Sequence, residues 1–167
     1  MANNRGKEFE NQIKTQLSII PDVSLDRVRD STVGYLGNVN ICDFICYKYP
    51  YEFYIECKAI HGNTLNFKGH IREKQWEGLL EKSKIKGVFA GILCWFIKAE
   101  KTVYIPIEFL ENEKQAGKKS INQKYIDTFI QMGEDLSDTD KIIELKGKKK
   151  RIFYKYDFNE FFERFGC

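Results

Sequence analysis

One stretch decides the fold: residues 41–58 read ICDFICYKYPYEFYIECK. Two runs rich in β-branched and aromatic residues flank a short turn that contains Pro50, and this pattern predicts a β-hairpin. A hairpin centred on the Tyr49–Pro50 bond places Asp43 opposite Glu56. Directly opposed side chains on one face have Cβ atoms roughly 4.5–5.5 Å apart. The stretch therefore predicts two neighbouring carboxylates.

A lysine accompanies these carboxylates. Lys58 lies on the same face as Glu56 because side chains alternate along a strand. Two carboxylates repel each other and destabilise a sheet unless a positive charge lies between them. The combination has the composition of a divalent-metal site with a lysine beside it. The alternative is an exposed hairpin on which Lys58 only neutralises Glu56, since such surface ion pairs are common and weak.

The first strand of this hairpin is otherwise apolar on both faces. Alternation places Cys42, Phe44 and Cys46 on one face, and Ile41, Ile45 and Tyr47 on the other. A strand of this kind is expected to be buried on both sides. A buried carboxylate needs a partner, which favours the metal site over the exposed hairpin.

Length and composition predict a single globular domain. The chain has 167 residues, 43% hydrophobic and 31% charged, and such a chain can build a core that stands alone. Its net charge of +3 is small, so local clusters of charge matter more than the total. The strongly apolar run at residues 88–97 is too short to span a membrane.

The cysteines predict a cellular compartment. Five cysteines at irregular positions, without a recognisable signal peptide, are typical of reduced thiols in a cytoplasmic protein. Cys42 and Cys46 lie on one predicted strand and are poorly spaced for structural zinc.

An N-terminal helix is expected to begin near Arg5, after two asparagines that can cap it. Its buried stripe consists of apolar residues four positions apart: Phe9, Ile13 and Leu17. Glu10 borders this stripe, whereas Glu8 faces water. Glu10 can therefore reach a neighbouring active site, although an ordinary solvated glutamate gives the same pattern.

A second helix is expected at about residues 70–84. Its buried face consists of Trp76, Leu79, Leu80 and Ser83. Gln75 lies along the edge of that face, one turn before Leu79. This amide can be a satisfied core residue, or it can orient a water or a ligand.

Further strands and helices are expected around the hairpin. The strands are at residues 23–29, 87–97 and 102–107, and the helices at 107–114, 125–132 and 158–165. Residues 31–40 and 115–120 are expected to be loops, the second of them basic. A C-terminal hairpin is expected from strands at 142–145 and 152–156, with a basic tip at 146–151. Such a tip can be merely solvated or can contact phosphate.

The carboxylates and the lysine suggest phosphodiester hydrolysis. Asp43, Glu56 and the Cys57 carbonyl can supply three oxygens to Mg²⁺, which prefers oxygen ligands. The metal lowers the pKa of a water and stabilises charge on phosphorus. Lys58 can orient the attacking water or steady the developing charge, and Glu10 can hold the metal or one of its waters. These groups need no covalent intermediate.

Asp43 followed by Glu56-Cys57-Lys58 resembles the motif of the PD-(D/E)xK nuclease superfamily. Gln75 matches a helical glutamine found in many members, and the helix–sheet–helix order fits their fold. The resemblance implies an α/β, restriction-endonuclease-like fold, in which helices flank a mixed central β-sheet. Residues 1–167 would form one PD-(D/E)xK nuclease domain.

A closer resemblance is to RecU-type Holliday junction resolvases. Residues 4–10, NRGKEFE, are similar to their N-terminal Asn-Arg-Gly motif, which ends in a glutamate and so implies a role for Glu10. Residues 64–75 resemble their segment after the catalytic lysine, and residues 117–121, GKKSI, resemble a later basic motif. The similarity extends to about Ile126.

The chain also departs from the RecU pattern. Cys42 replaces the usual proline before the aspartate, and Cys57 is the middle residue of the Glu-x-Lys motif, but neither change removes a ligand. The interval from Glu10 to Asp43 is too short for the stalk that RecU proteins insert there and that helps to hold the junction. The resemblance therefore implies a compact, phage-encoded relative.

This resemblance implies a metal-dependent, structure-selective DNA endonuclease that resolves Holliday junctions in recombination and repair. The implied cofactor is Mg²⁺, with Mn²⁺ able to replace it. Paired cuts imply a homodimer on four-way junction DNA, in the cytoplasm of a bacterial cell or a phage-infected host, without a membrane. Two alternatives stay open. One is a restriction-like or repair nuclease that acts on linear duplex DNA, and the other is a non-catalytic DNA-binding protein.

The implied catalytic residues are Glu10, Asp43, Glu56, Lys58 and Gln75, and the implied metal ligands are Asp43, Glu56, Cys57 and Glu10. DNA recognition is expected to depend on phosphate contacts and branched shape more than on base edges. The candidate DNA-binding residues are Arg5, Lys7, Thr64, Lys68, Arg72, Lys118, Lys119, Lys148, Lys149 and Lys150.

Overall fold

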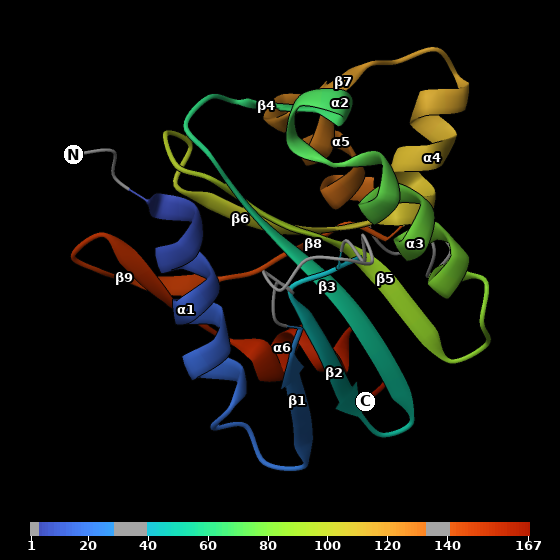
Figure 1. Cartoon of the computed structure of the whole chain (residues 1–167). Helices are drawn as coiled ribbons and strands as arrows, with labels where there is room; N and C mark the ends of the chain where they lie inside the picture. The colour runs from blue at the N-terminus through green and yellow to red at the C-terminus, as the bar shows by residue number, and fades with distance from the viewer. Residues whose placement is uncertain (1–3, 29–39, 133–140) are drawn as a thin grey trace, which may run out of the picture.

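A computed structural model describes residues 4–28, 40–132 and 141–167. Its centre is a six-stranded sheet in the order β1-β2-β3-β5-β6-β8 (Figure 1). The strands are β1 (Val23–Arg27), β2 (Phe44–Lys48), β3 (Tyr51–Ile60), β5 (Val88–Phe96), β6 (Lys101–Pro106) and β8 (Ile143–Glu144). β3 and β5 are parallel, whereas the other neighbours are antiparallel, so the sheet is mixed as predicted.

Helices cover both faces of this sheet (Figure 1). The first face carries α2 (Phe67–His70), α3 (Glu73–Ser83), α4 (Ile107–Gln115) and α5 (Gln123–Met132), and the second carries α1 (Arg5–Leu17) and α6 (Phe158–Glu163). Alternation along the central strand β5 divides its side chains between two cores. Ile92 and Cys94 pack toward α3, whereas Leu93 and Trp95 pack toward α1 and α6.

The β2–β3 hairpin has the predicted register. Phe44 pairs with Ile55 and Lys48 pairs with Tyr51, on either side of a turn at Tyr49–Pro50. The strand pairing ends at Phe44, one residue short of the expected pair of Asp43 with Glu56. The cause is local, because the Asp43 N–H donates to the Ile55 carbonyl at 3.1 Å instead.

The predicted faces of β2 are correct only within the strand itself. Phe44 and Cys46 pack toward α1 and α6, and Ile45 packs toward α3. Cys42 packs on the α3 side instead of the predicted side, because it precedes the strand and does not follow its alternation. Tyr47 is 44% exposed, so the expectation of burial is wrong at that end.

The N-terminal helix begins and packs as predicted. The Asn4 side chain accepts a hydrogen bond from the Lys7 N–H at 3.3 Å and caps α1. Phe9, Ile13 and Leu17 form its buried stripe. This stripe anchors α1 on the sheet and leaves Glu10 at the border of the core.

The helix predicted at residues 70–84 begins three residues later than expected and follows a separate short helix. α2 ends at His70, and Arg72 has an extended backbone with ψ 146°, so that α3 begins at Glu73. Trp76 and Leu79 are buried as predicted, whereas Leu80 and Ser83 are only partly buried. The break places Gln75 in the first turn of α3.

The C-terminal hairpin differs from the prediction. β8 (Ile143–Glu144) pairs with β6 and extends the main sheet, because Ile143 joins the core on the α1 and α6 side. The basic run is itself a strand, β9 (Gly147–Lys150), which pairs with β10 (Phe153–Tyr156). The lysines predicted at a hairpin tip therefore lie along a strand.

A second small sheet forms where a loop was expected. β4 (Thr64–Asn66) pairs with β7 (Ser120–Asn122), so the basic segment before β7 lies beside the residues that follow β3. The other predicted strands and helices occur close to their expected positions. The loop expected at residues 31–40 lies almost entirely outside the described residues. Within the described parts of the chain, the helices are too short or too polar to cross a membrane.

Gly91 is a site where the close approach of β5 and β6 can be tested. A Cβ atom at this position would lie 2.5 Å from the Ile105 carbonyl oxygen and 2.7 Å from Tyr104 Cζ. We expect Gly91→Ala to lower the free energy of unfolding by about 1–3 kcal/mol, as overpacking does. Gly62→Ala is the control because its Cβ would have no atom within 4 Å. Urea denaturation measures both, and equal stability of the two variants would contradict the prediction.

Candidate active site

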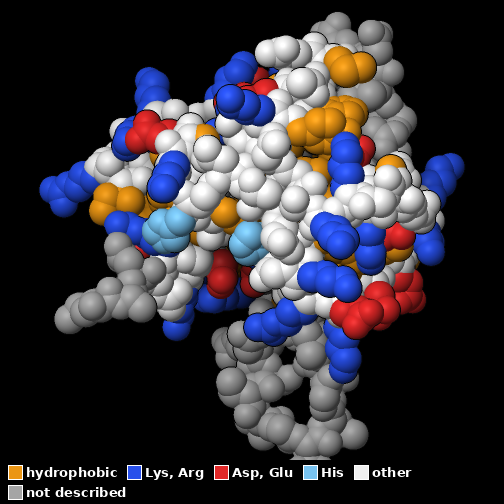
Figure 2. All heavy atoms as spheres, turned by 90° about the horizontal axis from the view of Figure 1, so that it is seen from above, with side chains coloured by type: hydrophobic (Ala, Val, Ile, Leu, Met, Phe, Trp, Pro, Cys, Tyr) orange, Lys and Arg blue, Asp and Glu red, His pale blue; other side chains and the backbone are white. Residues whose placement is uncertain are grey.

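A cleft of about 830 Å³ opens between α1, β1, the chain before β2, β3 and the start of α3. Four of the predicted catalytic side chains line it: Glu10, Asp43, Glu56 and Gln75. The carboxylates of Asp43 and Glu56 therefore face the same space. Figure 2 shows acidic side chains in a recess of the molecule, with histidine, lysine and arginine side chains around it.

Asp43 is held by the backbone of both neighbouring strands. Its carbonyl accepts a hydrogen bond from the Val28 N–H at 2.9 Å. Its carboxylate oxygen Oδ2 accepts one from the Cys57 N–H at 2.7 Å. The Asp43 side chain thus accepts a hydrogen bond from the backbone of β3 at the point where the pairing of β2 with β3 has ended. This bond holds its carboxylate beside Glu56.

Glu56 is the buried member of the pair, with 3% of its surface exposed. Its Oε1 accepts hydrogen bonds from Lys58 Nζ at 2.6 Å and from Gln75 Nε2 at 2.7 Å. Its Oε2 is also buried but has no hydrogen-bond partner. A buried carboxylate oxygen without a partner is energetically unfavourable, so this oxygen needs a proton or a cation.

The surroundings of Glu56 favour its protonated form. Burial, and next the Asp43 carboxylate, raise the pKa of Glu56 to about 7, although Lys58 and Gln75 act in the opposite direction. The repulsion predicted for the two carboxylates is therefore present, and Lys58 offsets it only in part. A bound divalent cation would offset this repulsion, and Oε2 could serve as one of its ligands.

Gln75 connects the second helix to this carboxylate. Its Oε1 accepts the Arg72 N–H at 3.2 Å, a donor at the start of α3, and its Nε2 donates to Glu56. The amide is therefore both a satisfied buried group and an orienting group for Glu56. The sequence offered these two roles as alternatives. Because α3 begins only at Glu73, Gln75 can bond both to the helix start and to Glu56, and so it has both roles.

Glu10 lies in the cleft but is directed to an arginine. Its Oε2 is 3.3 Å from Arg27 Nη2, at the end of β1. Arg27 belongs to a predicted strand, but nothing in the sequence indicated that this strand runs beside α1. Arg27 and Lys14 thus line the cleft without having been predicted as site residues.

The donor atoms fit a divalent metal. Asp43 and Glu56 offer hard carboxylate oxygens, of which Glu56 Oε2 has no other partner, and Mg²⁺ is bound by one or two carboxylates together with waters and substrate phosphates. Among the described residues, no three His, Cys, Asp or Glu side chains are grouped closely enough to hold a metal. Direct ligation by Glu10 and by the Cys57 carbonyl stays a prediction.

The predicted DNA-binding residues lie in two regions. The pairing of β4 with β7, and the hydrogen bond from the Phe67 N–H to the Lys119 carbonyl at 3.0 Å, bring Thr64, Lys68 and Lys119 together. The β9–β10 hairpin lies against α1, because Gln16 bonds to the backbone of β10. Residues 148–150 are therefore separate from the first region.

Three of the predicted cations are already engaged within the protein, among them Lys149, which forms an ion pair with Glu100. Lys118 forms an ion pair with Glu113 and lies 3.5 Å from the centroid of the Tyr125 ring. Arg5 is 3.3 Å from Glu8. By contrast, four other candidates are exposed, at the cleft, on α2 and directly before α3 and β7: Lys7, Lys68, Arg72 and Lys119.

Comparison with known proteins identifies the fold. No protein-family model and no curated protein matches the chain. The structure is similar to that of Hjc, a Holliday junction resolvase from the archaeal hyperthermophile Archaeoglobus fulgidus, with a TM-score of 0.51 and 18% sequence identity. The match covers 72% of this chain and 90% of that chain. The fold is therefore restriction-endonuclease-like, as predicted.

The raised pKa of Glu56 predicts how pH affects stability without metal. Between about pH 5 and pH 7 the folded chain keeps a proton that the unfolded chain loses, because an ordinary glutamate titrates near 4.5. The free energy of unfolding should therefore fall as pH rises through this range. Added Mg²⁺ should restore stability at pH 8 by binding the folded state. Denaturation in EDTA and in Mg²⁺ measures both effects.

Glu56→Gln isolates the carboxylate responsible. This variant should show a weaker pH dependence and no stabilisation by Mg²⁺. Glu73→Gln, an exposed change at the start of α3, is the matched control and should behave as the wild type does. Stability that rises with pH over the same range in the wild-type protein would contradict the assignment.

Proposed function

We propose that the chain is a metal-dependent DNA endonuclease that resolves Holliday junctions, as a compact, phage-encoded relative of the RecU-type enzymes. One observation carries the proposal: the buried Glu56 carboxylate is held by Lys58 and Gln75, with its second oxygen unpartnered and Asp43 in the same cleft. The likeness of the fold to Hjc, a Holliday junction resolvase, supports it.

In this proposal Asp43 and Glu56 hold the metal, which is Mg²⁺ or, in its place, Mn²⁺. When bound, the cation supplies positive charge that stabilises negative charge on the phosphate. Gln75 orients Glu56 through its 2.7 Å hydrogen bond to Oε1, which leaves Oε2 without a hydrogen-bond partner. The Cys57 N–H fixes Asp43 in the same way. Both ligands are thus positioned before a metal binds.

Lys58 has the second role in this proposal. Lys58 itself does not line the cleft, but its ammonium is 2.6 Å from Oε1 of Glu56, which does, and its side chain is 21% exposed. An ammonium there can orient the attacking water and stabilise the charge that develops on the phosphate. Glu10 can accept a proton from a water at the cleft once its ion pair with Arg27 opens.

DNA binding in this proposal depends on positive charge around the acidic cleft. The carboxylates repel phosphate, so cations on the rim must offset them. Lys7 lines the cleft, and Lys68 and Lys119 lie together beyond it. Figure 2 shows that lysine and arginine side chains surround the recess on this face. Contacts of this kind read phosphate positions and branched shape more than base sequence.

Paired cuts require two active sites. We therefore propose that the protein acts as a two-fold homodimer on four-way junction DNA, in recombination and repair in the cytoplasm of a bacterium or an infected host. A single chain has one such cleft among its described residues, and two-fold symmetry would present two clefts to strands of like polarity.

Cleavage of defined DNA substrates tests the function. We expect Mg²⁺-dependent, paired cuts in a four-way junction and slower cleavage of linear duplex. Asp43→Asn should reduce cleavage about a hundredfold or more while junction binding is retained or tightened, because the variant carries less negative charge near phosphate. Asp26→Asn, an exposed change on β1, is the control. Equal cleavage of linear duplex would favour a restriction-like or repair nuclease, and binding without any cleavage would favour a non-catalytic DNA-binding protein.

The dimer is tested separately by analytical ultracentrifugation. The free protein should sediment as a species of twice the chain mass of 19.7 kDa, and a junction should bind one such dimer. A stable monomer that still cuts DNA would contradict the proposed two-fold dimer and its paired cuts. It would leave the proposed nuclease activity standing.

A further inference from the structure

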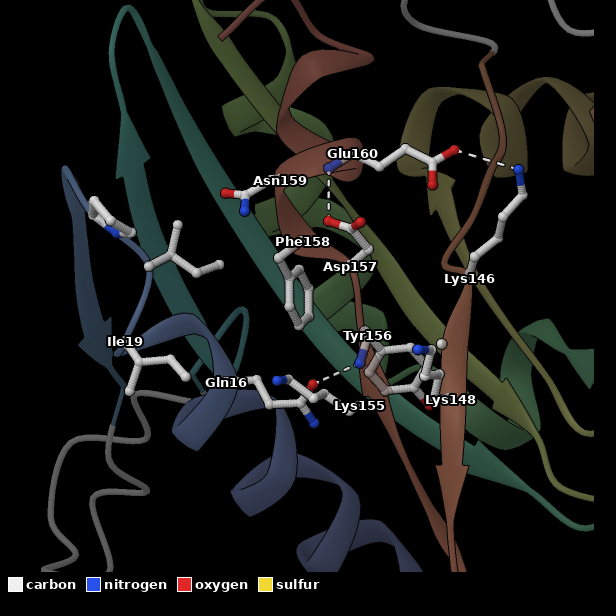
Figure 3. A pocket seen from close by; sticks show the side chains of 13 residues that line it. Gln16, Ile19, Lys146, Lys148, Lys155, Tyr156, Asp157, Phe158, Asn159 and Glu160 are labelled. Atoms are coloured by element: carbon white, nitrogen blue, oxygen red, sulfur yellow. Dashed lines mark hydrogen bonds and ion pairs between the residues drawn. The ribbon is translucent and has the colours of Figure 1, made fainter.

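A second pocket, of about 630 Å³, lies between the end of α1, the β9–β10 hairpin and the start of α6 (Figure 3). It lies across α1 from the catalytic cleft. Lys14 lines the cleft, whereas Gln16, about 200° further around the helix, lines the pocket and bonds to β10. The proposed catalytic residues do not line it.

Two uncompensated positive charges lie beside this pocket. Lys148 and Lys155 are direct partners across the β9–β10 hairpin, and both line the pocket (Figure 3). Like charges in directly opposed positions destabilise a hairpin. Within the described residues neither lysine forms an ion pair, whereas Lys146 is paired with Glu160 and Lys149 with Glu100. The pair is therefore suited to an anion.

The opposite side of the pocket is apolar and exposed. Ile19 is 73% exposed, and Ile20 and Pro21 continue the same wall. Phe158 borders the pocket between this wall and the lysines (Figure 3), but its ring is buried, with 3% of its surface exposed. A pocket with an exposed apolar wall and a pair of cations fits a ligand that has both an apolar face and a negative charge.

The carboxylates of the pocket are occupied within the protein. Asp157 Oδ1 accepts the Glu160 N–H at 3.1 Å and caps α6. The Glu160 carboxylate lies 3.4 Å from Lys146 and 3.6 Å from Arg164. The Glu160 carboxylate is thus compensated by Lys146 and Arg164, and within the described residues neither carboxylate forms an ion pair with Lys148 or Lys155.

We infer that this pocket binds one unpaired nucleotide of a DNA strand, with its phosphate between Lys148 and Lys155 and its base against the exposed side chain of Ile19. The choice of DNA rests on the proposed nuclease function. The nucleotide is unpaired because a base inside a duplex has both faces stacked. Glu10 and Gln16 are about 9 Å apart along the axis of α1, a helix about 10–12 Å in diameter, so a strand that occupies both the cleft and the pocket must also pass around α1.

Binding of short single strands in EDTA tests the inference without cleavage. The probes are fluorescent hexathymidylate and a hexamer of abasic sugar-phosphate units, followed by anisotropy. The abasic hexamer should bind at least about fivefold more weakly, because it has no base to stack in the pocket. Ile19→Ser should weaken only the binding of hexathymidylate. Lys148→Ala and Lys155→Ala should weaken both probes and reduce the slope of log affinity against log salt by about 0.7 for each phosphate that is no longer neutralised.

Matched controls lie on the turn between α3 and β5. Ile85→Ser and Lys86→Ala change one exposed isoleucine and one exposed lysine there and should leave binding unchanged. Equal affinity for the two hexamers, or equally weakened binding in Lys86→Ala and Lys148→Ala, would overturn the inference. Junction cleavage with Mg²⁺ is measured separately. Cleavage without base-dependent binding refutes the pocket alone, whereas base-dependent binding without cleavage refutes the nuclease alone.

Discussion

The candidate site depends on one constraint, the burial of a carboxylate in the middle of an apolar sheet. Glu56 is 3% exposed on β3, between strands whose other side chains form two hydrophobic cores. A group of this kind is tolerated only with hydrogen bonds and compensating charge. Lys58 and Gln75 satisfy one oxygen, and the other stays unpartnered. The same burial destabilises Glu56 as an anion and leaves its Oε2 in need of a proton or a cation.

Local irregularities around Glu56 follow from this constraint. The strand pairing stops before Asp43, which lets its carboxylate take the Cys57 N–H and turn to the cleft. The helix breaks at Arg72, which places Gln75 where its amide bonds to both the helix start and Glu56. Regular pairing or an unbroken helix would have prevented these hydrogen bonds. Departures from regular structure are expected at functional sites.

The fold is shared with a resolvase despite 18% sequence identity. The sheet tolerates such divergence because its strands need apolar side chains of suitable volume more than particular residues. Function does not follow from the fold alone, so the proposal depends on Glu56, Asp43, Lys58 and Gln75. The hairpin β9–β10 adds lysines on the far side of α1, where we propose that an unpaired nucleotide binds.

The sequence by itself determined the hairpin, its register and most of the helices and strands, because these depend on local alternation and on residues four positions apart. It also identified Asp43, Glu56, Lys58 and Gln75 as one group, since three of them lie on one hairpin. Tertiary structure alone decided the rest. Arg27 reaches Glu10 only because β1 lies beside α1. Ile143 pairs with β6, which moves the lysine run from a tip into a strand. Such contacts join distant segments, and their geometry depends on how the layers pack and not on any local pattern.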